Sequence, residues 1–424
     1  MPQIADRLAA RAHLPLEATD ADVLRTLTLT NVAAGVGELG AVAELLKALP
    51  LDVTTRTTDA AFVLAAQLHA RTQDDFYPEG RVHVGAITLA VTLALADHVK
   101  DRTLKCLAAG YRVLCAVAEA HSAEAQRRGM RPSGVFGPFG AAACAAIALG
   151  LDQAQTANAI ALAAAACAGH NQAWIAGSDE WLLEVGAAAR AGLEAALFTR
   201  AGARAAPDAF EGRYGWASAL FDEPGAMTLA SSLEAGVLGP RVVAIKPYPV
   251  SGIAQVPTSL ACALHDEVAG EPIEDIRVYI SPIEHAYPGS ANRGPFASRS
   301  SALMSVAFCV ACGIADGAVR LERLEHPGTP DLAALLDRVR VEPDEAIPEN
   351  EARVEARFAR GREARRAGRA AEILFPPWDE LCADSDALAQ RSEADPSLVT
   401  AVRTELAKPA PRATELRRLL EGGS

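Results

Sequence analysis

Apolar residues recur at helical spacing through most of the first 240 positions. Residues 85–97 are dense in Leu, Ala and Val and follow a loop marked by Pro and Gly, which predicts a helix. Residues 102–127 place Leu104, Leu107, Tyr111 and Leu114 near helical spacing and predict a longer amphipathic helix. Two further helices are expected, one that begins after Asp152 as its N-cap and one over residues 186–202.

Beyond residue 240 the pattern changes to strand periodicity. Ile276, Val278 and Ile280 alternate with more polar residues, which predicts a strand. Residues 339–341, 353–359 and 370–375 are further strand candidates for an antiparallel sheet, and residues 300–319 predict an apolar helix. After Trp378 the helical pattern returns. The pattern therefore predicts a mainly α protein: a large all-helical domain of residues 1–241 and 378–424, with a smaller α+β domain, residues 242–377, inserted in it.

Composition supports a globular chain and narrows its partners. The 424 residues are 50% hydrophobic, much of it alanine, and carry a net charge of −13. This hydrophobic share excludes a wholly disordered chain, and the acidic balance argues against a nucleic-acid binder, which needs a basic face. A small anionic substrate stays compatible, because a few cations in a pocket can outweigh a screened surface charge.

Two uncharged stretches, residues 132–151 and 153–178, are long enough to cross a membrane. They consist largely of Ala and Gly and are interrupted by polar residues and Pro138, so we expect buried core helices and no membrane partner. Cys309 and Cys312 have the spacing of a metal or redox pair, but no second pair supports it, and the eight cysteines are expected to be mostly small buried residues. The first residues lack the apolar core of a signal peptide, so a reduced, cytoplasmic protein is expected.

The segment 73–85 is the first candidate for chemistry. It holds two carboxylates, Tyr77 and His83 in a loop that enters a predicted helix. The positive end of a helix dipole favours a neutral imidazole and attracts an anion, and a neutral histidine is what a general base requires. The alternative is a histidine hydrogen-bonded to Asp75 for structural reasons only.

Two further segments could bind an anion. Residues 129–140 are rich in Gly and Pro, which predicts a rigid loop that aims backbone N–H groups and the guanidinium of Arg131 at a carboxylate; close helix packing through glycine is the alternative. Lys246 lies between an apolar run and two prolines at the domain junction, where clefts form, although this segment could instead be a hinge. The remaining histidines are expected at the surface or at helix ends; these include His13, His69, His98, His121, His265, His285 and His326.

Taken together and in order, seven segments resemble the MmgE/PrpD family: residues 82–96, 110–113, 132–143, 149–152, 210–212, 246–249 and 316–317. The family includes 2-methylcitrate dehydratase, cis-aconitate decarboxylase and iminodisuccinate epimerase. The resemblance implies a large all-helical domain with an inserted α+β lid, a homodimer, no metal and no organic cofactor. It also implies a small di- or tricarboxylate substrate, bound between the helical domain and the lid.

The resemblance transfers to individual residues only in part. His83 matches the family's active-site histidine, Lys246 matches the lysine at the start of the lid, and Asp74 and Asp75 match an acidic pair. Several family positions are substituted. The substituting residues are Arg131 for a histidine, Trp181 for a lysine, Glu184 for a histidine, Ser251 for Cys or His, and Phe308 for a tyrosine.

The resemblance implies a cofactor-independent lyase or isomerase that transfers a proton next to a carboxylate and thereby permits dehydration, decarboxylation or epimerisation. We expect His83 to transfer the proton, Asp75 to orient it, and Lys246 and Arg131 to neutralise substrate carboxylates in a locally positive site. Residues expected to contact the substrate as well are Tyr77, Ser251, Arg299 and Gln172. The alternative, supported by the substitutions, is a non-catalytic homologue that binds an organic acid or a protein partner.

Overall fold

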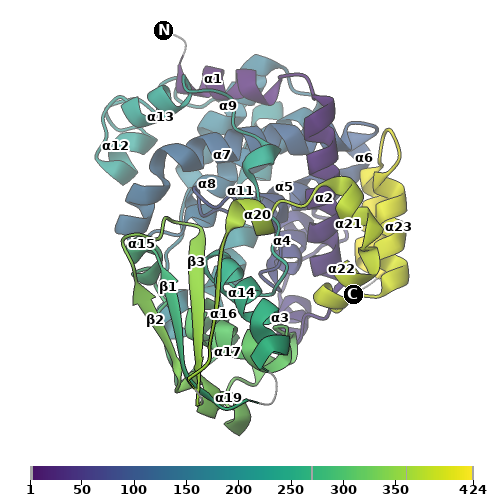
Figure 1. Ribbon diagram of the computed structural model, residues 1–424. Coiled ribbons are helices and arrows are strands. Elements are labelled where there is room, and N and C mark those ends of the chain that lie inside the picture. Colours follow the sequence, from purple (N-terminus) through teal and green to yellow (C-terminus); the bar gives the residue numbers. More distant parts are fainter. Residues whose placement is uncertain (1–2, 269–270, 360, 423–424) are drawn as a thin grey trace.

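Helices form most of the molecule, and a four-stranded sheet extends from one end (Figure 1). This computed structural model describes residues 3–268, 271–359 and 361–422; the ends of the predicted helical domain, residues 1–2 and 423–424, lie outside the described residues. The helical part contains α1 (Ile4–Ala12), α2 (Ala18–Val36), α3 (Ala41–Ala48), α4 (Thr57–His69), α5 (Val84–Ala94), α6 (Ala96–Val99), α7 (Thr103–Arg127), α8 (Pro132–Leu149), α9 (Gln153–Ala163), α10 (Ala173–Ala176), α11 (Glu180–Arg200), α12 (Trp216–Phe221) and α13 (Met227–Ser232), and the C-terminal helices α21 (Trp378–Ala383), α22 (Ser385–Ser392), α23 (Pro396–Leu406) and α24 (Ala413–Gly422).

Close packing around α8 explains the alanine-rich composition. At Gly192 of α11 a Cβ atom would lie 2.4 Å from the Cβ atom of Ala141, and at Gly140 of α8 it would lie 2.7 Å from the Cβ atom of Leu114 on α7. The small side chains thus let α7, α8 and α11 approach closely. The rigid loop expected over residues 129–140 is therefore wrong for most of that segment, because α8 begins at Pro132, a residue well suited to a first helical turn. The alternative, helix packing through glycine, is the one observed.

Among the described residues, one helix, α8, is long and apolar enough to cross a membrane. If the bent pair α2 and α3 is counted as a single span, there are two such candidates. The α8 segment is 94% buried inside the protein, as a core helix would be. The predicted N-cap at Asp152 is confirmed: its side chain accepts a hydrogen bond from the backbone N–H of Gln155.

The α+β part carries a mixed sheet with the strand order β2-β1-β3-β4. Its strands are β1 (Ile273–Ile280), β2 (Val339–Pro343), β3 (Glu351–Phe358) and β4 (Glu363–Arg369), and its helices are α14 (Gly252–Val268), α15 (Pro282–His285), α16 (Arg299–Met304), α17 (Val306–Asp316), α18 (Leu321–Glu325), α19 (Pro330–Leu336) and α20 (Ala370–Ile373). β1 and β2 are parallel and the other pairs antiparallel, so the expected purely antiparallel sheet is wrong. α14 and α17 pack against the sheet.

Two sequence expectations in this part are corrected. The fourth strand is Glu363–Arg369, and residues 370–373 form α20 instead. β4 contains three arginines, Arg365, Arg366 and Arg369, and charged side chains suit an edge strand because they can face water. The helix expected over residues 300–319 is divided at Ser305 into α16 and α17. On α17, Cys309 and Cys312 are both fully buried, as expected for small apolar residues.

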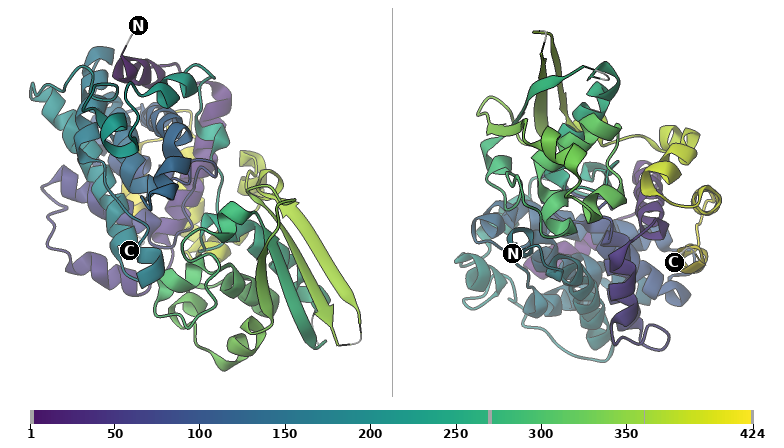
Figure 2. Two further views of the ribbon diagram at one scale, coloured as in Figure 1. Left: turned by 90° about the vertical axis from the view of Figure 1, so that its left-hand side faces the viewer. Right: turned by 90° about the horizontal axis from the view of Figure 1, so that it is seen from below.

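Backbone hydrogen bonds join the two parts near the chain crossings. The loop after α4 pairs with the segment before α14, where the N–H groups of Phe76 and Ala244 donate to each other's carbonyl groups at 3.0 and 2.8 Å. The N–H of Ile245 donates to the carbonyl of Leu374 at 2.9 Å, so the chain enters and leaves the α+β part at one place. The sheet lies at the far side of this part from the helical part (Figure 2), and α23 packs on α2.

Candidate active site

A cavity lies where the helical part meets the α+β part. Its apolar lining comprises Phe76, Pro78, Trp174, Ile253, Leu303 and Met304; its polar lining includes Thr72, Arg81, His83, Arg131, Lys246, Ser251, Glu284 and Tyr287. His83 is the N-cap residue of α5 and Arg131 that of α8, so the starts of two helices point toward this region. Four of the predicted site residues, His83, Lys246, Arg131 and Ser251, are brought together here.

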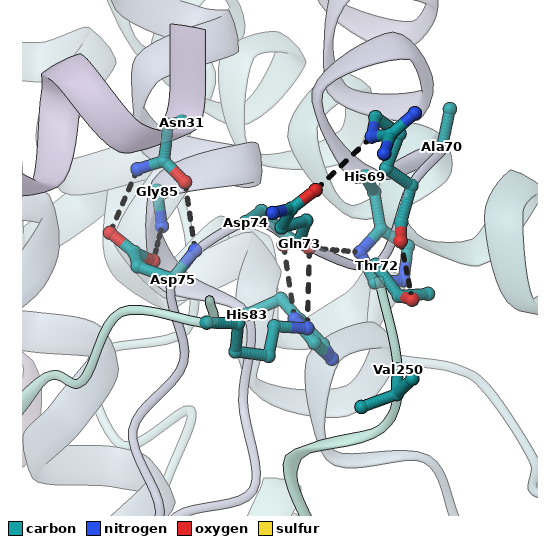
Figure 3. A network of polar contacts seen from close by, with 12 residues as sticks. Asn31, His69, Ala70, Thr72, Gln73, Asp74, Asp75, His83, Gly85 and Val250 are labelled. Atoms are coloured by element: carbon teal, nitrogen blue, oxygen red, sulfur yellow. Dashed lines mark hydrogen bonds and ion pairs between the residues drawn. The ribbon is translucent and has the colours of Figure 1, made fainter. Parts of the chain in front are cut away.

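Asp74 is the centre of a buried polar cluster at the base of this cavity (Figure 3). One carboxylate oxygen, Oδ1, lies 2.9 Å from Nδ1 of His69 and 3.5 Å from Nζ of Lys246. The other, Oδ2, lies 3.0 Å from Nδ1 of His83. A single carboxylate therefore contacts two imidazoles and one ammonium group.

The partners of His69 define its protonation state. Its Nε2 accepts a hydrogen bond from Nη2 of Arg131 at 2.9 Å, because a guanidinium group has donors only. Nδ1 must then carry the hydrogen that is donated to Asp74. His69 is thus a neutral link between Arg131 and Asp74, and it stays neutral because burial lowers its pKa to about 3.

His83 is also held neutral at pH 7. Burial lowers its pKa to about 4, since it outweighs the attraction of Asp74, and the nearby ammonium of Lys246 lowers the pKa further. The pKa of Asp74 lies well below the usual range: burial opposes ionisation, but His69, His83 and Lys246 together favour the carboxylate. Nδ1 of His83 lies 3.0 Å from Oδ2 of Asp74, although the geometry is not that of a hydrogen bond, and Nε2 is the nitrogen on the other side of the ring.

Lys246 is a buried cation without a hydrogen-bond partner among the described residues. Its side chain is fully buried, although it lines the cavity, and its Nζ lies 5.8 Å from the centre of the Phe76 ring. Burial lowers its pKa, opposed by Asp74. Its N–H donors are therefore available to an anion in the cavity.

Arg131, in contrast, is already occupied by protein groups. Nη1 donates to the carbonyl of Trp181 and lies 3.4 Å from a carboxylate oxygen of Glu184, while Nη2 donates to His69. The guanidinium carbon also lies 5.1 Å from the centre of the Trp174 ring. Trp181 and Glu184, which replace a lysine and a histidine of the family, thus both contact Arg131, which itself replaces a family histidine.

The contact expected between Asp75 and His83 is wrong, because Asp74 makes it. Asp75 accepts hydrogen bonds from the backbone N–H of Gly85 at 2.6 Å, from Nδ2 of Asn31 at 2.8 Å, and from the hydroxyl of Tyr111. Burial raises the pKa of Asp75 to about 6, although these three donors favour its ionised form. Asp75 therefore ties the first turn of α5 to α2 and α7 beneath the site.

Three expected substrate contacts lie outside the cavity. The hydroxyl of Tyr77 donates to Glu119, and Gln172 is exposed at the start of α10. Arg299 donates to the backbone carbonyls of Leu39 and Ala70 and so joins α16 to the helical part. The substituted Phe308 is fully buried against Phe296, 5.1 Å between ring centres.

Several site residues were not singled out from sequence. His69 was expected at the surface or at a helix end. It does end α4, but it is fully buried. Its spacing of five residues from Asp74 was the sequence feature that could have identified it as a site residue. Trp174, Glu284 and Tyr287 line the cavity from segments without a recognisable motif, and the Tyr287 hydroxyl lies 3.3 Å from the side-chain oxygen of Asn171.

The expectation of a locally positive site is also wrong. Three cations line the cavity, namely Arg81, Arg131 and Lys246, and four carboxylates line it or contact these cations, namely Asp74, Glu184, Glu284 and Glu349. Burial raises the pKa of Glu284, but even a neutral Glu284 leaves as many carboxylates as cations.

His69, Asp74 and His83 could present ligand atoms within 4.8 Å of one another to a metal ion. This donor set fits a cation poorly. Both nitrogens of His69 are engaged, by Arg131 and Asp74, and Lys246 already contacts the carboxylate with its own positive charge. The cluster is better suited to hold a proton acceptor than a metal ion.

Comparison with known proteins gives two matches to family models. The MmgE/PrpD N-terminal domain matches residues 30–228, and the MmgE/PrpD C-terminal domain matches residues 248–372. No curated protein matches the chain. The two models together cover most of the chain, including His69, Asp74, His83 and Arg131, while Lys246 lies between the two matched ranges.

Proposed function

The chain belongs to the MmgE/PrpD family, and on that premise we propose that it is a cofactor-independent lyase or isomerase that moves a proton at the carbon next to a carboxylate of a small organic acid. Members of the family are generally lyases of the dehydratase type, which supports an enzyme that acts on an organic acid. The observation that carries the proposal is the contact of 3.0 Å between Asp74 and a neutral, cavity-lining His83.

His83 is the proposed proton acceptor. Its Nε2 takes the proton from the carbon next to the substrate carboxylate, and the electron pair of that C–H bond moves into the carboxylate to form an aci-carboxylate. Asp74 lies 3.0 Å from Nδ1 of the ring, and its negative charge stabilises the imidazolium that forms. The electron pair can then expel a leaving group, which is a lyase reaction, or take up a proton again, which is an exchange or epimerisation.

Lys246 is the proposed binding site for the substrate carboxylate. Charge on this group grows as the aci-carboxylate forms, and a buried ammonium without another hydrogen-bond partner would stabilise it at little reorganisation cost. Ser251 and Tyr287 offer hydroxyl groups on the cavity wall for a leaving group or a second oxygen.

The proposal is tested by proton exchange. The protein is incubated with a panel of mono-, di- and tricarboxylic acids in deuterated water, and NMR follows the α-proton signal and any new product. Loss of that signal, or product formation, is expected for at least one acid. His83→Gln should slow the reaction by about 100-fold or more, because it removes the proton acceptor.

Exposed His98 on α6 offers a matched control, since His98→Gln changes the same side chain away from the cavity and the Asp74 cluster. Turnover by His83→Gln within a few-fold of wild type would show the mechanism to be wrong. A rise in melting temperature with an acid, but no exchange and no product, would instead identify a non-catalytic binding protein.

A further inference from the structure

Building on the proposed function, we propose that the site selects an acid with one carboxylate and an apolar substituent and discriminates against di- and tricarboxylates. The inference names the substrate class of the same cavity. It rests on how the charged side chains are paired around that cavity and on where the apolar side chains lie.

Among the cations that line the cavity in the described part of the chain, Lys246 alone makes no hydrogen bond to a protein group. Lys246 is fully buried, lines the cavity, and has no hydrogen-bond partner among the described residues. Asp74, 3.5 Å away, balances the charge of Lys246 but leaves its N–H donors unused, so a carboxylate that docks there gains hydrogen bonds to an ammonium group.

The two other cations of the wall are neutralised within the protein. Arg131 is held by the Trp181 carbonyl, Glu184 and His69, and Arg81 donates a hydrogen bond to Glu349. A second substrate carboxylate would have to displace Glu184 from Arg131 or Glu349 from Arg81. Neither displacement adds a net ion pair, because one carboxylate is exchanged for another.

The remaining wall disfavours a second negative charge. Glu284 lines the cavity and is itself 5% exposed, with its oxygens bonded to Ser281 and to the backbone N–H of Asn350. An anion placed near it faces another carboxyl group. The α+β side also contributes the apolar side chains of Ile253, Leu303 and Met304, which suit a hydrocarbon group, beside the hydroxyl groups of Ser251 and Tyr287.

The size of the cavity agrees with this assignment. Its free volume is about 70 Å³, whereas other hollows on the molecule have volumes of 480 to 680 Å³. A small volume with one anchoring charge favours an acid of few atoms. The apolar wall then contacts the substituent of the substrate. In a polycarboxylate a second carboxylate would occupy that place.

The test uses three related α,β-unsaturated acids: tiglate, methylfumarate and trans-aconitate. Methylfumarate replaces one methyl group of tiglate by a carboxylate, and trans-aconitate adds a third carboxylate to the remaining methyl group. Binding to the full chain is measured by isothermal titration calorimetry at pH 7.5. We expect tiglate to bind at least about tenfold more tightly than either of the other two, the factor that one unpaired buried charge readily supplies.

Two variants separate the roles of the cations. Lys246→Met should weaken tiglate binding by about tenfold or more, with a circular dichroism spectrum that confirms folding. Glu184→Gln frees Arg131 from its carboxylate and should narrow the preference for tiglate over methylfumarate by about tenfold. Glu180→Gln is the matched control, because Glu180 lies one turn earlier on α11 and does not line the cavity.

Equal or tighter binding of methylfumarate or trans-aconitate by the wild type overturns the inference, and so does a failure of tiglate to bind. These outcomes are distinct from failure of the proposed function. Tiglate preference without proton exchange on any acid supports the substrate class and contradicts the enzyme, whereas exchange confined to polycarboxylates supports the enzyme and contradicts the substrate class.

Discussion

At the scale of single residues, the site depends on one carboxylate that serves several partners. The sequence places two aspartates side by side before His83, and neighbouring side chains in extended chain point to opposite sides. The residue types therefore predict that an aspartate supports His83, but not which one. Asp74 contacts the ring, and Asp75 instead accepts from Gly85 at the start of α5. The two carboxyl groups accordingly have opposite pKa shifts.

The pKa of His83 provides a prediction at this scale. Because it is lowered to about 4, mainly by burial and further by Lys246, the histidine should stay neutral from pH 7 down to about pH 5. NMR titration of ¹³C-labelled histidine should show its midpoint near 4. Lys246→Met should raise the midpoint, since a repelling charge is lost, and Asp74→Asn should lower it, since the attracting charge is lost.

A His83 midpoint near the ordinary value of about 6.5 in the wild type would contradict the electrostatic description of the site. A His83 midpoint that does not change in Lys246→Met would show that the lysine has no electrostatic effect on His83. That result would contradict the role of Lys246 in the proposed mechanism.

At the scale of elements, periodicity predicted most helices and three of the four strands. Errors arose where composition resembles a loop or where charge conceals a strand. Residues 132–140 combine Gly and Pro as loops do, yet they begin α8, because Pro132 occupies a first helical turn and the glycines meet neighbouring helices. β4 is rich in arginine because it is an edge strand exposed to water.

The packing of α8 against α11 yields a prediction for a single methyl group. Gly192→Ala would place a Cβ atom 2.4 Å from both the Ala141 Cβ atom and the Pro138 carbonyl oxygen. Overpacking of this kind should lower the free energy of unfolding by about 1–3 kcal/mol, even though alanine favours helix more than glycine does. Urea unfolding followed by circular dichroism measures the change.

The matched control is Gly422→Ala at the end of α24, where nothing lies within 4 Å of the added Cβ atom. This variant should unfold within about 0.5 kcal/mol of the wild type, as surface substitutions usually do. A stable Gly192→Ala protein would mean that α8 and α11 can separate without cost, contrary to the close packing described.

At the scale of the whole molecule, the sequence predicted a mainly helical protein with an α+β insertion, and the mainly α class is confirmed. The contacts that join the two parts were beyond sequence reasoning, since they link positions far apart in the sequence, 260 residues in the case of Arg299 and Leu39. Arg299 was expected to bind substrate, but it contacts the carbonyls of Leu39 and Ala70. The domain limits, the homodimer and the cytoplasmic location stay predictions.

Arg299 gives the prediction at this scale. Arg299→Met leaves two buried carbonyl groups without their donor at the junction of the two parts, and each should cost about 1–3 kcal/mol. The free energy of unfolding should therefore fall by several times the change in Arg366→Met, whose partly exposed ion pair with Glu267 contributes at most about 1 kcal/mol. Equal destabilisation by the two variants would contradict a structural role for Arg299.

The paired crossing of the chain at Ile245 and Leu374 bears on how such proteins diversify. Because the α+β part enters and leaves at neighbouring points, it resembles a cassette that recombination can exchange as a unit. His69, Asp74 and His83 belong to the host scaffold, whereas Ile253, Leu303, Met304 and Glu284 belong to the cassette. A homologue could thus keep its proton-transfer residues and gain a different substrate specificity through a single recombination event.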